Sequence, residues 1–270
     1  MRSQDEQLGG DSDGEALSTG HKVIVSVVAS ILFSFVGYFV LQFFADFYPL
    51  EQECHHNGQC EGKDIAVQSS TNLHLIGTAM NEYVRDHGDF PPAVFYDKDD
   101  KPLYSWRVLL LPYLKEKSLW AQFELDEPWD SPNNKPLLAR MPHAFMPPSQ
   151  TKPEEPYATH YQVFTGGGAM FDADPNVWPH TIQEIASANG TRKTLMVVEA
   201  TEPVPWTKPE DLPYSPDRPL PKLGLFSSGI HILTANSAVH RLPSDTDEET
   251  LRDMITWNNK NVQGLKTAIR

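Results

Sequence analysis

Three oxygen-bearing side chains, Asp172, Asp174 and Asn176, stand at alternate positions in the second half of the chain. This is the spacing of the first three ligands of a calcium-binding loop, because Ca²⁺ prefers carboxylate and amide oxygens. The rest of such a loop is missing: Val177 stands where the loop needs glycine, and Gln183 stands where it needs a bidentate glutamate. We therefore interpret the segment as a solvated polar turn, and a calcium site on the same three side chains is the alternative.

The only two cysteines, Cys54 and Cys60, enclose five residues that include the adjacent histidines His55 and His56. In an oxidising compartment a disulfide between the two cysteines is the expected pairing. Two cysteines and two histidines could also supply four ligands to a metal ion. Adjacent histidines in so tight a loop rarely point at one ion, so we predict the Cys54–Cys60 disulfide. A metal site and unpaired thiols are the alternatives.

Acid–base and nucleophilic chemistry has few candidates in this sequence. Glu199 and Glu202 lie close together, and histidines such as His231 and His240 could meet a carboxylate or a serine in space. No spacing indicates such a pair, and the chain has neither a G-x-S-x-G elbow nor an H-E-x-x-H pair. The glycines at 166–168 are not followed by Lys-Ser/Thr, so they predict a tight turn rather than a phosphate-binding loop. We predict no catalytic residue, no cofactor and no enzymatic activity.

Six tryptophans are many for one domain. They are Trp106, Trp120, Trp129, Trp178, Trp206 and Trp257. Packing in the core and under loops is the interpretation we adopt, because these large side chains bury much apolar area. The alternative is an exposed stacking surface for a protein or sugar partner.

All of these residues follow an apolar run of 23 residues, Val23 to Ala45, which carries no charge. A helix of that length crosses a hydrocarbon core of about 30 Å, since each residue adds about 1.5 Å. The run is longer than the apolar part of a signal peptide, and no small-x-small cleavage site follows it. We predict an uncleaved signal anchor that contacts the lipid bilayer through Val23 to Ala45.

The orientation of the anchor follows from its flanks. Lys22 precedes the apolar run, whereas Asp46, Glu51 and Glu53 follow it. Positive flanks stay in the cytoplasm, so we expect a single-pass protein of the cytoplasmic membrane with its C-terminal domain outside. The expected regions are an acidic disordered tail (1–20), the anchor (21–45), a linker with the cysteine loop (46–63), an α+β domain (64–258) and a polar tail (259–270).

The net charge of the chain is −14, and its hydrophobic content is 40%. That hydrophobic content is typical of a globular domain rather than of a disordered chain. An acidic domain repels phosphate backbones, which argues against nucleic acid as a partner.

Hydrophobic periodicity and turn residues predict a long helix first, then mainly antiparallel strands with short helices between them. This order is typical of the α+β class. We expect helices over 64–87, 108–114, 133–140 and 246–257, strands over 93–96, 103–106, 160–165, 194–200, 230–235 and 238–242, and a proline-rich loop over 201–221. Asn236-Ser237 forms the tip of the last hairpin, where asparagine tolerates a positive φ. The last helix begins with a capping box at Thr246-Asp247-Glu248-Glu249.

Eight segments between about residue 68 and residue 257 form a pattern that is specific only when the segments are taken together. They are Ser70–Tyr83, His87–Ala93, Ser105–Leu114, Asp126–Lys135, Tyr161–Phe164, Val198–Ala200, Val204–Leu212 and Thr246–Leu251. Together they resemble a bacterial pilin-like family, a domain of unknown function named for an H-x9-D-G signature. The resemblance implies a membrane helix that leads into an extracytoplasmic helix packed on an antiparallel sheet.

Two departures from the family pattern stand out. Gly20 is followed by His21-Lys22-Val23, and no glutamate interrupts the anchor, so the prepilin cleavage motif is absent and the anchor is expected to be permanent. In the last hairpin the family histidine aligns with a serine, and the aspartate-glycine turn is replaced by Asn236-Ser237. We infer that the signature is mainly structural in this chain.

Together these features predict a membrane-anchored pilin-like protein with envelope proteins as partners and a structural or interaction role. Two other functions stay open at this point. One is a surface module that binds a glycan or a peptide through its tryptophans, and the other is an envelope hydrolase that uses histidines and carboxylates.

Overall fold

A computed structural model describes residues 59–148, 156–172, 179, 181–225 and 229–258. The tail at 1–20, the apolar run Val23 to Ala45 and Cys54 lie outside the described residues. Within the described ranges, no helix combines the length and the apolar composition needed to cross a membrane.

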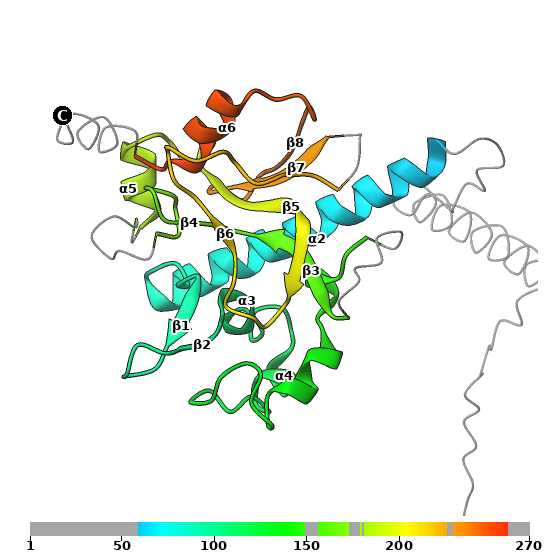
Figure 1. The fold of residues 1–270 in the computed structure, drawn as a ribbon, viewed down its shortest axis with the longest axis vertical. Coiled ribbons are helices and arrows are strands. Elements are labelled where there is room, and N and C mark those ends of the chain that lie inside the picture. The colour runs from blue at the N-terminus through cyan, green and yellow to red at the C-terminus, as the bar shows by residue number, and fades with distance from the viewer. Residues whose placement is uncertain (1–58, 149–155, 173–178, 180, 226–228, 259–270) are drawn as a thin grey trace, which may run out of the picture. The chain divides into compact units, whose positions relative to one another are not determined.

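Helix α2 (Gln59–His87) is 29 residues long and runs along the sheet (Figure 1). It was expected from residue 64, so its end is as predicted and its start is earlier. Leu73, Ile76 and Met80 recur at helical spacing and are fully buried. The helix ends because Gly88 adopts φ +80° and donates its N–H to the Val84 carbonyl at 2.7 Å, a left-handed termination that glycine permits.

A hairpin and several short helices follow α2. The hairpin of β1 (Val94–Tyr96) and β2 (Pro102–Ser105) is confirmed. The helix expected at 108–114 is instead α3 (Trp106–Leu109), because the Ser105 hydroxyl caps it by accepting the Arg107 N–H. The helix expected at 133–140 is a 3₁₀ helix, η1 (Lys135–Arg140). The remaining short elements are α4 (Lys117–Trp120), η2 (His143–Phe145) and α5 (Ile182–Ser187).

The main sheet has four antiparallel strands in the order β3-β5-β7-β8. They are β3 (Ala158–Gln162), β5 (Leu195–Pro205), β7 (Ile230–Thr234) and β8 (Val239–Leu242). Two expectations were wrong here. The strand expected at 160–165 is interrupted at Val163, and its end, β4 (Phe164–Thr165), pairs in parallel with β6 (Leu212–Pro213). The loop expected at 201–221 contains both β6 and the last residues of β5.

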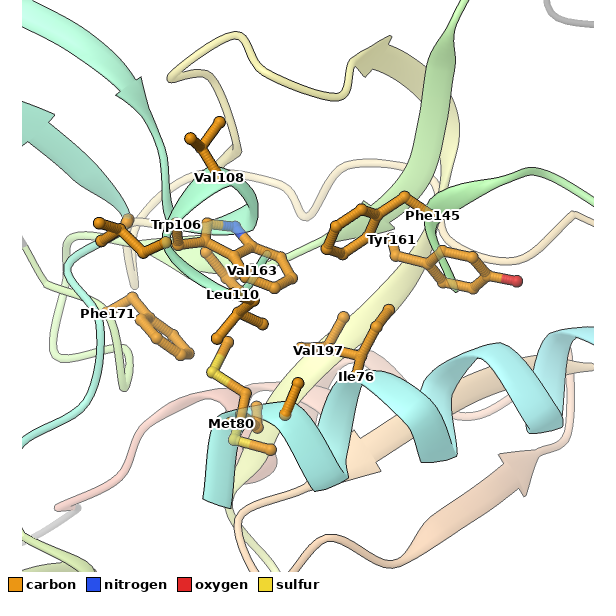
Figure 2. Packing of buried hydrophobic residues seen from close by; sticks show 14 of the residues in the cluster. Ile76, Met80, Trp106, Val108, Leu110, Phe145, Tyr161, Val163, Phe171 and Val197 are labelled. Carbon is orange, nitrogen blue, oxygen red and sulfur yellow. The ribbon is translucent and has the colours of Figure 1, made fainter. Parts of the chain in front are cut away.

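Each face of the sheet carries its own apolar cluster, which follows from the alternation of side chains along a strand. On one face Ile76 and Met80 of α2 meet Val197, and Figure 2 shows Trp106, Phe145 and Tyr161 across the same core. The opposite cluster joins Val198 and Ile232 to Ile255 of the last helix, α6 (Glu248–Ile255). The cap of α6 is Asp247 rather than Thr246, because the Asp247 carboxylate accepts the Thr250 N–H at 2.8 Å. Helices packed on antiparallel strands confirm the α+β class.

The β7–β8 hairpin turns at the expected place with a different residue in the left-handed conformation. Ser237, not Asn236, has the positive φ of +61°. The Asn236 side chain instead accepts the Thr234 hydroxyl at 2.7 Å, which is the local bonding that favours asparagine in turns.

Candidate functional site

Five polar side chains meet between α2 and the sheet. Ser69 and Asn72 come from α2, Tyr161 from β3, Glu199 from β5 and His231 from β7. Tyr161 pairs with Glu199 in the sheet, and the neighbouring pair Val198–Ile232 sets His231 beside Glu199. These five residues, which we call the buried polar row, are at most 3% exposed. The strand register and the helix therefore bring together residues that lie far apart in the sequence.

Glu199 is the centre of the buried polar row. One of its oxygens, Oε2, accepts the His231 Nδ1–H at 2.8 Å and the His231 backbone N–H at 3.3 Å. Its other oxygen accepts the Ser69 hydroxyl. A buried carboxylate needs such donors, because water no longer solvates it. Glu199 thus links a helix residue to a strand residue through one charged group.

The other end of the row is formed by a phenol and an amide. The Ser69 and Tyr161 hydroxyls are 3.1 Å apart, and Asn72 Nδ2 donates to the Tyr161 hydroxyl at 3.2 Å and to the Met146 carbonyl at 2.9 Å. Burial raises the pKa of Tyr161, so its hydroxyl stays neutral. Asn72 Oδ1 is buried without a hydrogen-bond partner.

The order of the groups decides which chemistry the row can perform. A serine nucleophile needs a general base in contact with its hydroxyl, and the carboxylate then orients that base. Here the carboxylate of Glu199 stands between Ser69 and His231, so the imidazole is not the partner of the hydroxyl. The arrangement joins α2 to β3, β5 and β7 by hydrogen bonds and does not have the geometry of a catalytic triad.

A second histidine, His160, is buried beside the same strands. Its Nδ1 lies 3.0 Å from the Ala200 carbonyl, so Nδ1 carries the proton. Burial lowers the pKa of His160, although the bond to Ala200 and the charge of Glu199 oppose this change. Its Nε2 is buried and has no hydrogen-bond partner.

A buried ion pair lies beside β3, which is an edge strand of the main sheet. Arg107 and Asp211 are joined at 2.6 Å between Nη2 and Oδ1, and their side chains are 0% and 1% exposed. Arg107 Nε and Nη2 donate to the Tyr161 carbonyl at 3.1 and 2.9 Å. Its Nη1 donates to Ser105 Oγ at 2.8 Å and to Asp211 Oδ2 at 3.4 Å. All five guanidinium N–H groups therefore have acceptors.

Asp211 completes this edge from the other side. Its Oδ1 accepts the Val163 N–H at 2.9 Å and the Trp106 indole N–H at 3.3 Å. Burial raises the pKa of Asp211 and lowers that of Arg107, and in each case the opposite charge of the partner opposes the shift. The pair thus supplies hydrogen bonds to the Tyr161 carbonyl of β3 and to the N–H of Val163, which directly follows β3.

The sequence-based candidates have different outcomes. Asp172 accepts the Gly168 N–H at 2.9 Å, whereas Asp174 and Asn176 lie outside the described residues. Among the described residues no three His, Cys, Asp or Glu side chains gather as metal ligands would. Cys60 lies in the first turn of α2, and the predicted partner Cys54 falls outside the described ranges.

The tryptophans that the structure describes follow the packing interpretation. Trp106, Trp206 and Trp257 are buried, and Trp120 and Trp129 are partly buried against the core. Trp178 lies outside the described residues. None of the described tryptophans is therefore a freely exposed stacking platform.

Glu199 and His231 were both candidates from the sequence, and no spacing in the sequence predicts that they pair. Glu202 and His240, the neighbours considered with them, are exposed. A signal was present: Glu199 interrupts the apolar strand segment LMVVEA, and His231 interrupts IHILT. A charged residue inside a buried strand needs a partner from another buried strand.

The fold defines an α+β domain in which a long helix lies on an antiparallel sheet. The model of a family described as a protein of unknown function (DUF1559) matches residues 66–267, so the chain belongs to this family. No curated protein and no solved structure matches the chain.

Proposed function

We propose that this chain is a membrane-anchored, extracytoplasmic, pilin-like protein with a structural or interaction role in the cell envelope. The observation that carries the proposal is α2, a 29-residue helix laid along an antiparallel sheet and preceded in the sequence by the uncharged run Val23 to Ala45. A helix of this length spans about 44 Å and so provides a rigid stem. Only residues 46–58 separate the stem from the proposed anchor.

A non-enzymatic role is supported by the chemistry of the buried polar row. Ser69 and His231 both bond to Glu199, and Glu199 occupies the position between serine and histidine that a base would need. The row is suited to hold α2 on the sheet. A hydrolase that uses His231 as its base is disfavoured for the same reason.

The proposal is tested by membrane fractionation and protease treatment of intact spheroplasts. The native chain is expected in the membrane pellet, with its domain digested from outside. Replacing Leu32 and Val36 by arginine is expected to move the chain to the soluble fraction, because each charge at the centre of a membrane helix costs about 3 kcal/mol. Leu32→Ile with Val36→Leu is the matched control and should stay in the pellet.

Recovery of the native chain in the soluble fraction would contradict the proposed membrane anchor. A domain protected from protease in spheroplasts and digested only after lysis would contradict the orientation. Hydrolytic activity that disappears in His231→Gln, while the thermal stability of that variant is unchanged, would contradict the non-enzymatic role.

A further inference from the structure

The outward face of α2 is unusual in an acidic protein. Residues 65–81 contain no Asp, Glu, Lys or Arg. The exposed positions on this stretch include Val67, which is 64% exposed, and Leu75, which is 41% exposed. The N-terminal turns of α2 project past the sheet (Figure 1). An uncharged helix face with large exposed apolar side chains is a feature of helices that pack against another helix.

The spacing along this face is that of a helix–helix seam. Val67, Thr71, His74 and Thr78 are exposed and follow one another in steps of four, three and four residues. Such steps keep one stripe facing a partner helix when two helices coil around each other. The seam continues to Asn81, and the first charge that follows is Glu82.

The two threonines in the stripe have already satisfied their polar groups. Thr71 Oγ1 donates to the Val67 carbonyl at 2.9 Å, and Thr78 Oγ1 donates to the His74 carbonyl at 2.9 Å. A threonine that bonds its own helix in this way has an acceptor for its hydroxyl proton within the helix. The two hydroxyls of the stripe therefore need no acceptor from a partner.

We propose that this stripe is the contact between two copies of the chain, with their α2 helices parallel and in register. A second copy is favoured because the chain has a net charge of −14, so two copies repel each other except where no charge is present. Seams with this repeat are commonly self-complementary, and cyclic dimers are the commonest oligomers.

The parallel direction rests on the proposed function. Two copies anchored in one membrane by Val23 to Ala45 enter α2 through linkers of the same length, residues 46–58, which sets Thr71 opposite Thr71. Confinement to the membrane also raises the effective concentration of one helix for the other, so a short seam suffices.

Cysteine cross-linking of the full-length chain in membranes tests the contact. In a Cys54→Ser, Cys60→Ser background, Thr71→Cys is expected to give at least about tenfold more disulfide dimer than the matched exposed control Ser118→Cys on α4. Equal yields for the two variants in the membrane pellet would overturn the seam and leave the anchor intact. A chain found in the soluble fraction would contradict the anchor, and the same two yields measured there would still decide on the seam.

A charge exchange tests register without altering the cysteines. Two differently tagged copies that both carry Thr71→Lys are expected to co-purify about tenfold less than native copies, because like charges meet across the seam. A Thr71→Lys copy with a Thr71→Glu copy should recover the native yield. Equal co-purification of the native pair, the Thr71→Lys pair and the mixed pair would overturn the proposal. An equal loss of co-purification in the Thr71→Lys pair and in the mixed pair would also overturn it.

Discussion

At the scale of single residues, Arg107 joins three segments of the described fold through buried hydrogen bonds to Ser105, Tyr161 and Asp211. It is fully buried, it pairs with Asp211, and it donates twice to the Tyr161 carbonyl on the edge of β3. Arg107→Ala is expected to lower the free energy of unfolding by about 3–5 kcal/mol, because it leaves Asp211 and the strand edge without partners. Urea unfolding measures this loss.

The matched control for Arg107 is Arg85, whose pair with Asp86 is exposed. Arg85→Ala is expected to change the free energy of unfolding by no more than about 0.5 kcal/mol. Similar losses for the two arginines would contradict the role given to the buried pair.

A second prediction at the residue scale concerns acid. Burial holds the pKa of His160 below its ordinary value of 6.5, so the folded chain keeps this imidazole neutral when the unfolded chain has taken up a proton. The contribution of His160 to the free energy of unfolding is therefore complete above about pH 6.5. It is lost as the pH falls from there toward the lower pKa of the folded state. The slope for one proton is at most about 1.4 kcal/mol per pH unit.

His160→Gln removes this titration while leaving a donor for the Ala200 carbonyl. The decline in unfolding free energy between about pH 7 and about pH 5 should be shallower in this variant than in the native chain. An unchanged slope in His160→Gln would show that His160 does not contribute.

At the scale of elements, the β7–β8 hairpin carries a residue in an unfavourable conformation. Ser237 sits at φ +61°, where residues with a Cβ atom are disfavoured by about 1 kcal/mol, and its hydroxyl makes only a long bond of 3.4 Å to the Gly77 carbonyl. Ser237→Gly is expected to raise the free energy of unfolding by about 0.5–1 kcal/mol. Ser237→Ala keeps the strain and removes the hydroxyl, so it should not stabilise the chain. A gain in both variants would mean that the hydroxyl, not the backbone, is the source of the cost.

The elements differ in how far the sequence predicts them, for physical reasons. The end of α2 and the strands β7 and β8 were predictable because local signals coincide: apolar periodicity, Gly88 as a terminator and Asn236-Ser237 as a turn. The pairing of β4 with β6 was not predictable, because a parallel contact between segments almost 50 residues apart has no local signature. The start of α3 was missed because the Ser105 cap decides it rather than the apolar run that follows.

The candidate site was less predictable than the fold. Glu199 meets His231 only because strand register places them side by side, and Ser69 joins them only because α2 crosses that face. Sequence distance hides such contacts, and the residue types alone are common on protein surfaces. Arg107 and Asp211 were hidden in the same way, since each lies in a segment whose neighbours are apolar or proline-rich.

At the scale of the whole molecule, all buried residues of the two apolar clusters lie between Leu73 and Trp257. The chain divides into residues 1–56 and 57–270, and the described core belongs to the second unit. A fragment of residues 57–270 is therefore expected to unfold in one cooperative transition, with a Tm within about 2 °C of the full-length chain in detergent.

A shorter fragment, residues 73–270, separates the contribution of the buried polar row from that of the apolar core. It keeps both apolar clusters and lacks Ser69 and Asn72, so Glu199 loses the donor on one of its oxygens and Tyr161 loses both of its side-chain partners. Each buried group left without a partner costs about 1–3 kcal/mol, which for a domain of this size lowers the Tm by several degrees. The double substitution Ser69→Ala, Asn72→Ala in fragment 57–270 keeps the first turns of α2, so it should reproduce most of the loss. A shorter fragment as stable as residues 57–270 would mean that α2 is held on the sheet by its apolar side chains alone.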